Sequence, residues 1–258
     1  MSLQAHPQPP LIDVLDQGVL TLTLNRPDKL NALDQGMIDA LHAALDYYAK
    51  VEDVRAVILT GSGGRSFAAG ADIAQLRDRT AIDAFRGVNA TLFDKVANFR
   101  VPTIAAIVGF ALGGGCELAI ACDLRVSGHS GRFGQPETGL GILAAAGATW
   151  RLPALIGLGR ARELLFTGRI VDAEEALQMG LVNAVVPDEE VADSALHMAQ
   201  MIARNDPLAT RLTKQALAAA QGDVAQARRF ADTAQALLFD SPEKFARMDA
   251  FLARKHKR

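Results

Sequence analysis

Three consecutive glycines, Gly113, Gly114 and Gly115, stand between two apolar segments and strongly restrict how this chain can fold. Residues 102–108, before them, have the composition of a buried strand, and the Ala- and Leu-rich residues up to about Cys122 have that of a helix. Three glycines at such a junction cost backbone entropy and need a structural reason. Without Cβ atoms the backbone can approach another group closely, and the helix that follows presents free N–H groups at its positive end. This arrangement suits a developing negative oxygen atom.

Other segments alternate between the same two patterns. Residues 19–24 alternate β-branched and apolar residues and residues 54–60 are apolar throughout, so both predict strands. Asp34 caps a helical pattern that runs to about Lys50, and residues 81–99 predict one longer helix. Strands that alternate with helices predict an α/β fold.

The pattern changes from about Arg160 onward, where helical spacing dominates and only residues 182–186 look extended. The predicted organisation is therefore an α/β core over residues 1–200, followed by a helical C-terminal region over residues 201–258.

Composition excludes several classes of protein. Half of the residues are hydrophobic, which allows a large core, and the net charge of −2 with a pI near 6.2 argues against a broad nucleic-acid-binding surface. The basic cluster at the C-terminus, from Arg254 to Arg258, is typical of a solvated chain end. The longest apolar run, around residues 104–120, contains four glycines and Glu117, so it predicts no membrane span. Cys116 and Cys122 predict buried free thiols, and no signal peptide is evident, so we expect a cytoplasmic location, with an organellar location without the presequence as the alternative.

Two glutamates are candidates for acid/base chemistry. Glu117 lies about one turn into the helix that follows the glycines, where an acidic residue is also a routine partner of the helix dipole. Glu137 follows Pro136 in a stretch with little charge, where burial would raise its pKa, although a solvent-facing turn residue is the alternative. Asp72 ends a small-residue loop and is either part of a site or a helix cap. The five histidines show no metal-ligand spacing.

These elements in combination resemble the enoyl-CoA hydratase/isomerase (crotonase) family from about Ile12 to the end of the chain. The matching stretches are Asn25-Arg26-Pro27-Asp28-Lys29-Leu30-Asn31-Ala32-Leu33, Phe67-Ala68-Ala69-Gly70-Ala71-Asp72-Ile73, Gly113-Gly114-Gly115-Cys116-Glu117, Phe133-Gly134-Gln135-Pro136-Glu137 and Gly180-Leu181-Val182-Asn183. The resemblance implies a spiral of ββα units and a helical C-terminal region that forms homotrimers, which commonly pair into hexamers. It also implies an acyl-CoA thioester substrate, no separate cofactor because CoA is part of the substrate, and no metal.

Within that family, the resemblance implies reversible addition of water to a trans-2-enoyl-CoA, giving a 3-hydroxyacyl-CoA in a hydro-lyase reaction of fatty acid metabolism. An enolate would be held in an oxyanion hole formed by the N–H groups of Ala71 and Gly114. Glu117 would orient and deprotonate water, and Glu137 would protonate the α-carbon, although the reverse division of roles stays open. Substrate or CoA contacts are expected from Lys29, Leu30, Ala69, Asp72, Ile73, Ala145, Phe251 and Arg254.

One stretch departs from the family pattern. Where many hydratases have Pro-Gly-Ala-Gly-Gly-Thr-Gln-Arg-Leu, this chain has Ala144-Ala145-Ala146-Gly147-Ala148-Thr149-Trp150-Arg151-Leu152, with Ala145 beside the expected position of the catalytic water. Two other functions stay open: a double-bond isomerase or a hydratase specialised for one acyl group, and a non-catalytic role such as RNA binding. The presence of both glutamates and the acidic pI argue against the last.

Overall fold

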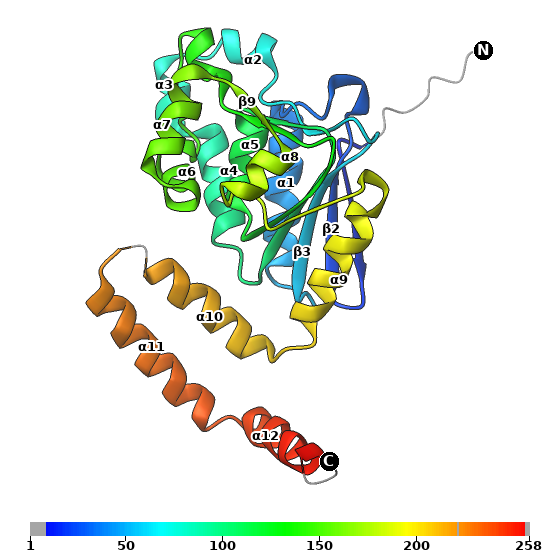
Figure 1. The fold of residues 1–258 in the computed structure, drawn as a ribbon, viewed down its shortest axis with the longest axis vertical. Helices are drawn as coiled ribbons and strands as arrows, with labels where there is room; N and C mark the ends of the chain where they lie inside the picture. Colours follow the sequence, from blue (N-terminus) through cyan, green and yellow to red (C-terminus); the bar gives the residue numbers. More distant parts are fainter. Residues whose placement is uncertain (1–8, 221, 256–258) are drawn as a thin grey trace, which may run out of the picture. The chain divides into compact units, whose positions relative to one another are not determined.

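A computed structural model describes residues 9–220 and 222–255 of the 258-residue chain, and only the backbone of residues 254 and 255. The chain divides into two compact units, Met1–Gln200 and Met201–Arg258. The first unit contains two β-sheets with helices around them, and the second consists of helices (Figure 1).

The larger sheet has six strands in the order β1-β2-β3-β5-β7-β10. Their bounds are Leu11–Asp16 (β1), Val19–Leu24 (β2), Ala56–Gly61 (β3), Thr103–Ile107 (β5), Leu124–Gly128 (β7) and Ala184–Val186 (β10). β1 pairs with β2 in antiparallel fashion, and all the other neighbours pair in parallel. Leu20, Leu22 and Leu24 are fully buried along one face of β2, as the two-residue period of a strand requires.

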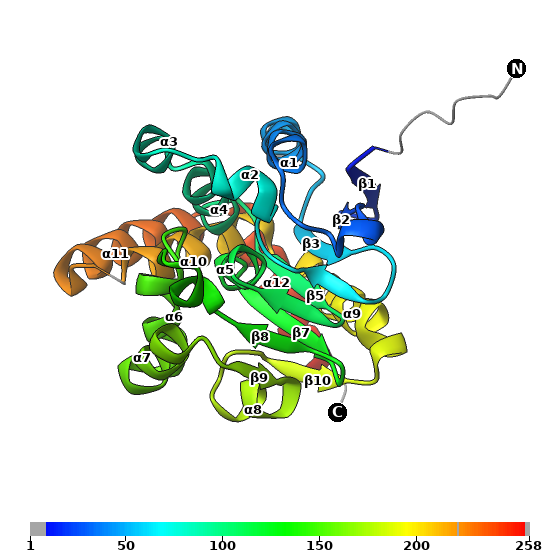
Figure 2. The same ribbon diagram turned by 90° about the horizontal axis from the view of Figure 1, so that it is seen from above.

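The smaller sheet has four strands in the order β4-β6-β8-β9. Their bounds are Ser66–Ala68 (β4), Phe110–Leu112 (β6), Arg132–Gly134 (β8) and Ile170–Asp172 (β9). Three times along the chain, a strand of the larger sheet is followed by a strand of the smaller sheet and then by a helix, which makes a spiral of ββα units (Figure 2). The predicted α/β spiral is therefore confirmed.

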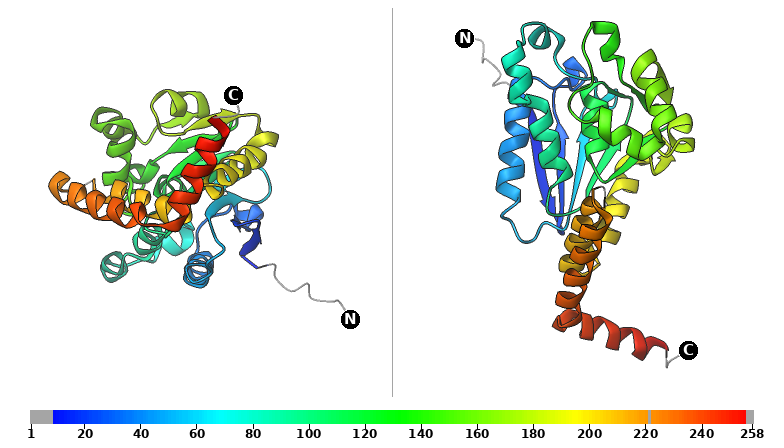
Figure 3. Two further views of the ribbon diagram at one scale, coloured as in Figure 1. Left: turned by 90° about the horizontal axis from the view of Figure 1, so that it is seen from below. Right: turned by 90° about the vertical axis from the view of Figure 1, so that its left-hand side faces the viewer.

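Helices cover both sheets of the first unit. They are Gln35–Tyr48 (α1), Ile73–Arg77 (α2), Ala81–Arg86 (α3), Val88–Ala97 (α4), Gly114–Ala121 (α5), Ala148–Ile156 (α6), Leu158–Thr167 (α7), Ala173–Gln178 (α8) and Val191–Ala203 (α9), with short 3-10 helices at Pro27–Lys29 (η1), Pro136–Leu140 (η2) and Asp188–Glu190 (η3). The predicted cap of α1 is present, because the Asp34 side chain accepts a hydrogen bond from the N–H of Met37. Helices α1 and α4 contact each other and run side by side (Figure 3, right).

The prediction of one helix over residues 81–99 is wrong. The chain forms two helices there, α3 and α4, which meet at Gly87. Gly87 has a φ of 61°, a left-handed conformation that ends α3 and that glycine adopts without a Cβ penalty.

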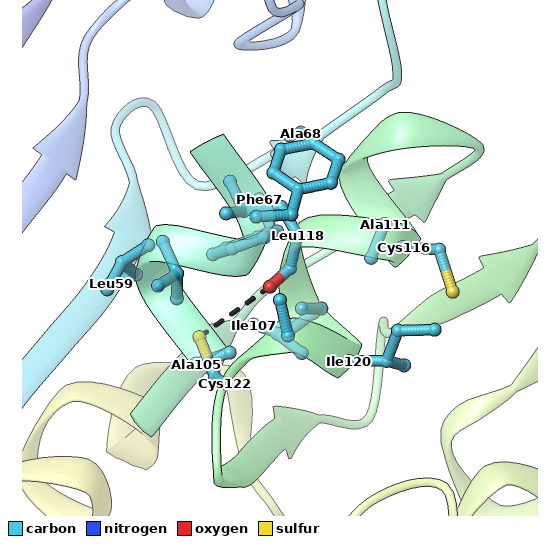
Figure 4. Close-up of a cluster of buried hydrophobic side chains, with 14 of the residues drawn as sticks. Leu59, Phe67, Ala68, Ala105, Ile107, Ala111, Cys116, Leu118, Ile120 and Cys122 are labelled. Carbon is cyan, nitrogen blue, oxygen red and sulfur yellow. Dashed lines mark hydrogen bonds between the residues drawn. The ribbon is translucent and has the colours of Figure 1, made fainter. Parts of the chain in front are cut away.

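Helix α5 is buried along its whole length, with every residue from Gly114 to Ala121 inside the first unit. Its apolar side chains pack among those of β3, β4, β5 and β6 (Figure 4). Both cysteines are free and buried, as the sequence predicts, and the Cys122 thiol donates to the carbonyl of Leu118. The helix that carries the glycine run therefore has a rigid apolar support.

The second unit contains Pro207–Ala219 (α10), Val224–Phe239 (α11) and Pro242–Lys255 (α12). Helices α10 and α11 pack against each other, yet α10 has no buried residue and Ala234 is the one buried residue of α11. Large apolar side chains are exposed on all three helices: Leu208, Leu217, Val224, Leu237, Phe239, Phe245, Met248, Phe251 and Leu252.

Candidate active site

Each glycine at the start of α5 lies close to a different part of the fold. Gly113 has a φ of +49°, and a Cβ placed there would lie 2.7 Å from Oε1 of Glu137. A Cβ on Gly115 would lie 1.9 Å from the carbonyl oxygen of Ala68, so only glycine lets α5 approach β4 this closely. A Cβ on Gly114 would meet no such collision, because its nearest neighbours lie at ordinary contact distances. The positive φ of Gly113 and the backbone packing of Gly115 therefore require glycine at these positions, and Gly114 needs a different reason.

That reason is the position of Gly114 beside the loop that contains Ala71. Hydrogen bonds from Leu33 N to Gly70 O (2.8 Å) and from Asp72 N to Leu33 O (3.2 Å) hold this loop. A Cβ on Gly114 would lie 3.6 Å from the backbone nitrogen of Ala71. Among the residues that the structure describes, neither the Ala71 N–H nor the Gly114 N–H has a hydrogen-bond acceptor. Two neighbouring backbone donors are thus available to one acceptor from outside the chain.

Glu117 projects from the first turn of α5 into the interior, and the side chain is 3% exposed. Its Oε1 accepts hydrogen bonds from the N–H groups of Ala146, at 2.8 Å, and Ala148, at 3.1 Å. Burial raises the pKa of Glu117 above its usual range, while these N–H groups and the charge of Arg151 act against that rise. Glu117 is therefore a buried carboxylate whose ionised form is specifically stabilised.

Glu137 lies in η2 and is also buried, at 9% exposure, so the alternative of a solvent-facing turn residue is wrong. Burial raises its pKa to about 7, and the negative charge of Glu117 adds to the rise. With its amide nitrogen facing the carboxylate, buried Gln135 donates to the two Glu137 oxygens at 3.3 and 3.2 Å. Two carboxyl groups that influence each other thus have different environments, which is the arrangement that separates an acid from a base.

Cys116, next to Glu117 on α5, is the third titratable group of this region. Burial raises the pKa of its thiol to about 12, and the charges of Glu137 and Glu117 act in the same direction. The thiol is therefore neutral at physiological pH and lacks the reactivity of a nucleophilic cysteine.

The loop with Lys29 and Leu30 lies near the Ala71 loop, because the N–H of Ala69 donates to the carbonyl of Leu30 at 3.0 Å. Buried Asn31 anchors it by donating from its side chain to the carbonyls of Ser62 and Ser66. Lys29 is exposed, as a group that meets an anionic ligand at the surface must be. The expected substrate contacts Lys29, Leu30 and Ala69 are thus adjacent in space.

Three other expected contacts belong to the first unit. Ile73 is exposed at the start of α2, and Ala145 is exposed in the loop before α6. Asp72 is the N-cap of α2, where it accepts from the N–H groups of Ala74 and Gln75 and lies 3.7 Å from Arg26. The helix-cap interpretation of Asp72 is therefore confirmed. The predicted contact with substrate would have to be made by a carboxylate that already interacts with these N–H groups and with Arg26.

Phe251 and Arg254 lie on α12 in the second unit. Phe251 is exposed, and the side chain of Arg254 lies outside the described residues. Their contacts with CoA stay predictions.

Three residues near the site were not predicted from the sequence. Gln135 contacts Glu137, as described above. Asn89 of α4 lies close to Gly114, since its Nδ2 would be 3.5 Å from a Cβ placed there. Arg151 of α6 donates to the carbonyl of Ala146 at 3.2 Å. A polar residue on an otherwise apolar helix face is the only sequence signal for Asn89. For Arg151, the neighbouring Trp150 obscures the same signal.

In the part of the chain that the structure describes, no cluster of three or more His, Cys, Asp or Glu side chains is arranged to hold a metal ion. Within residues 9–220 and 222–255, none of the helices has the length and apolar composition needed to cross a membrane.

Comparison with known proteins agrees with this geometry. The sequence model of the enoyl-CoA hydratase/isomerase family matches residues 15–256. This chain belongs to the enoyl-CoA hydratase/isomerase family.

Individual relatives are similar over most of their length. A short-chain-enoyl-CoA hydratase of Clostridium acetobutylicum is 40% identical over 240 residues, which make up 92% of each chain. A crotonyl-CoA hydratase of Syntrophomonas wolfei subsp. wolfei is 40% identical over 246 residues, covering 93% of this chain and 94% of the relative. A crystal structure of an enoyl-CoA hydratase from Bacillus anthracis has a TM-score of 0.90 and 36% identity, covering 96% of this chain and 97% of the other.

Proposed function

We propose that this chain is an enoyl-CoA hydratase, a hydro-lyase that reversibly adds water to a trans-2-enoyl-CoA to give a 3-hydroxyacyl-CoA. The observation that carries the proposal is the pair of buried carboxyl groups in unlike environments, Glu117 and Glu137, next to two free backbone donors. The similarity to a short-chain-enoyl-CoA hydratase and a crotonyl-CoA hydratase supports the same activity.

The N–H groups of Ala71 and Gly114 would act as the oxyanion hole. When water attacks C3 of the conjugated thioester, the electrons of the double bond move toward the thioester oxygen and give an enolate. Two fixed backbone donors stabilise that charge without reorganising, and the positive end of the α5 dipole points the same way.

Glu117 would orient the water and accept its proton. The two N–H groups that bind Oε1 favour the ionised form of this carboxyl in spite of its burial, as a general base requires. The exposed residue Ala145 would lie next to the same water.

Glu137 would supply the proton that C2 gains when the enolate collapses. With a pKa of about 7, a substantial fraction of this carboxyl is protonated near neutral pH. Hydroxyl adds to C3 and the Glu137 proton adds to C2, so one water is consumed. Glu117 then holds a proton and Glu137 is ionised. Glu117 releases its proton to solvent and Glu137 takes one up, which restores the starting state. The reverse division of roles remains a variant of the same proposal.

The names of the two relatives support a short acyl chain as substrate. Lys29 and Arg254 would contact the phosphates of CoA, with Phe251 beside the adenine, and Leu30, Ala69, Asp72, Ile73 and Ala145 would line the path to the acyl group. We further propose cytoplasmic action without a separate cofactor.

The second unit would serve as the assembly region. Its helices expose many large apolar side chains, and α10 buries none of its residues, as expected for a surface that another copy of the chain covers. We propose a homotrimer or a dimer of trimers.

Crotonyl-CoA tests the activity, because hydration removes the conjugated double bond and with it the near-ultraviolet absorbance of the enoyl thioester. The wild-type protein should remove this absorbance, and Glu137→Gln should do so far more slowly. Turnover of a 3-enoyl-CoA without hydration of crotonyl-CoA would instead identify an isomerase.

A further inference from the structure

The loop that binds Glu117 contains no side chain that can anchor it. Residues 144–148 are Ala, Ala, Ala, Gly and Ala, yet the N–H groups of Ala146 and Ala148 lie within hydrogen-bond distance of one carboxylate oxygen. Two donors are fixed on one acceptor only if the backbone between them is held in place. Ala148 begins α6 and the N–H groups of Trp150 and Arg151 bind the carbonyl of Gly147, but Ala146 lies before the helix and needs a group from another side chain to hold it.

Arg151 provides such a group from the first turn of α6. Its Nη1 donates to the carbonyl oxygen of Ala146 at 3.2 Å, and its Nη2 lies 2.5 Å from Oδ1 of Asp94 on α4. The guanidinium carbon lies 5.4 Å from the centre of the Trp150 ring, a cation–π distance. The side chain of Arg151 is only 14% exposed, so the planar guanidinium is held between three partners.

Gly147 makes room for this arrangement. Its φ is +147°, and a Cβ placed on it would lie 2.3 Å from Nη1 of Arg151. The guanidinium thus occupies the space that any other side chain would need at position 147. Glycine at position 147 thus leaves room for the guanidinium, and the φ of +147° is itself a conformation that favours glycine.

The guanidinium also acts on Glu117 through its charge. Arg151 works against the rise in the pKa of Glu117 that burial causes. The other titratable groups that interact with this carboxyl are Glu137 of η2 and Cys116 of α5, and both lack a positive charge. Arg151 is therefore the one cation known to favour the ionised form of Glu117 among the described residues.

We propose that Arg151 is a positioning residue of this site: it ties the Ala146–Ala148 loop to α4 through Asp94, and so holds two backbone donors against Glu117. The interaction chain runs from Asp94 to Arg151, to the Ala146 carbonyl, and on to the carboxylate. The effect of Arg151 on turnover rests on the proposed hydratase function. Its effect on the loop and on the ionisation of Glu117 does not.

The kinetic test uses full-length protein and crotonyl-CoA over a range of pH. Arg151→Gln should lower kcat by about 10- to 100-fold, the loss typical of a misplaced catalytic group, with KM nearly unchanged. The acidic limb of the kcat profile, where Glu117 must ionise, should move to higher pH. Arg151→Lys should restore the position of that limb and part of kcat, because it keeps the charge.

Asp94→Ala is the second variant, since it cuts the tie to α4 and leaves the arginine in place. It should lower kcat less than Arg151→Gln does. Lys95→Gln is the matched control, because it removes the neighbouring ion pair of α4, between Lys95 and Asp46, which faces α1. It should leave both kcat and the pH profile unchanged.

A structural readout separates this inference from the proposed function. In protein labelled with [15N]alanine, the amide signals of Ala146 and Ala148 should titrate with Glu117, and Arg151→Gln should shift that titration to higher pH. If the wild type fails to hydrate crotonyl-CoA, the proposed function fails while this titration still decides the role of Arg151. An unmoved titration and an unmoved acidic limb in Arg151→Gln would overturn the inference, whatever the change in thermal stability.

Discussion

Gly114→Ala adds one methyl group at the proposed oxyanion hole and should separate activity from folding. The added Cβ would lie 3.6 Å from the Ala71 nitrogen and 3.5 Å from Nδ2 of Asn89, both ordinary contact distances. The φ of Gly114 is not positive, so alanine fits the backbone without strain. At a helix position, alanine in place of glycine stabilises by up to about 1 kcal/mol. We therefore expect a melting temperature equal to the wild-type value or higher.

Activity should fall in the same variant, because the methyl group occupies space beside both backbone donors. Both N–H groups remain, but keeping the thioester oxygen away from one of them should have the effect of losing one oxyanion donor, which lowers kcat by about 10²–10³-fold, or ~2.7–4 kcal/mol of transition-state stabilisation. The assay is steady-state hydration of crotonyl-CoA together with thermal unfolding of the same preparation. A loss of this size in a fully folded protein is the predicted result.

Gly36→Ala is the matched control. Gly36 also lies in the first turn of a helix, α1, and a Cβ there would have only Asp34 Oδ1 nearby, at 3.7 Å. It should keep wild-type activity. Near-normal activity in Gly114→Ala would refute the assignment of the hole, and an equal loss in Gly36→Ala would show that the assay reports a general effect of helix substitution.

The remaining predictions concern the carboxyl pair and the CoA contacts. Glu117→Gln and Glu137→Gln should each lower kcat by about two to four decades while CoA binding, measured by calorimetry, is kept; full activity in either variant would remove that residue from the mechanism. Because the pKa of Glu137 is raised to about 7, its acid form disappears as pH rises, so kcat should fall on the alkaline side of about pH 7. Between pH 4.5 and about 7 the folded protein retains a proton that the unfolded chain has released, so the free energy of unfolding should fall with rising pH by on the order of 3 kcal/mol from this group. Denaturant titrations of Glu137→Gln should lack that decrease, and an identical decrease would place the titration elsewhere. Lys29→Ala combined with Arg254→Ala should raise KM for acyl-CoA several-fold with little change in kcat, and added salt should shrink the difference; an unchanged KM at low salt would show that CoA is held by other groups.

Much of the fold could be predicted because its signals are local. Alternation in residues 19–24 gives β2, and the cap at Asp34 gives α1. The strands of the smaller sheet are only three residues long, too short for a two-residue period to emerge, and none was predicted. The division at Gly87 was missed because one glycine within a helical pattern is often tolerated.

The site was predictable to a similar extent. Glu117, Glu137 and the glycine run occur in recognisable motifs, and the structure brings them together around the start of α5. The contact between Arg151 and Asp94 joins residues 57 positions apart through side chains alone, and no local pattern encodes it. Gln135 lies within one of these motifs, but its contact with both Glu137 oxygens depends on the side-chain conformations at the start of η2.

The most direct test of the account follows the atoms of water into the product. Crotonyl-CoA is incubated with the protein in D2 18O, and the product is analysed by mass spectrometry beside a Glu117→Gln/Glu137→Gln double variant. The account predicts 3-hydroxybutyryl-CoA with one 18O at C3 and one deuterium at C2 from the wild type, and no product above the uncatalysed background from the double variant. Equal product from both proteins, or a rearranged double bond without incorporated oxygen, would contradict it.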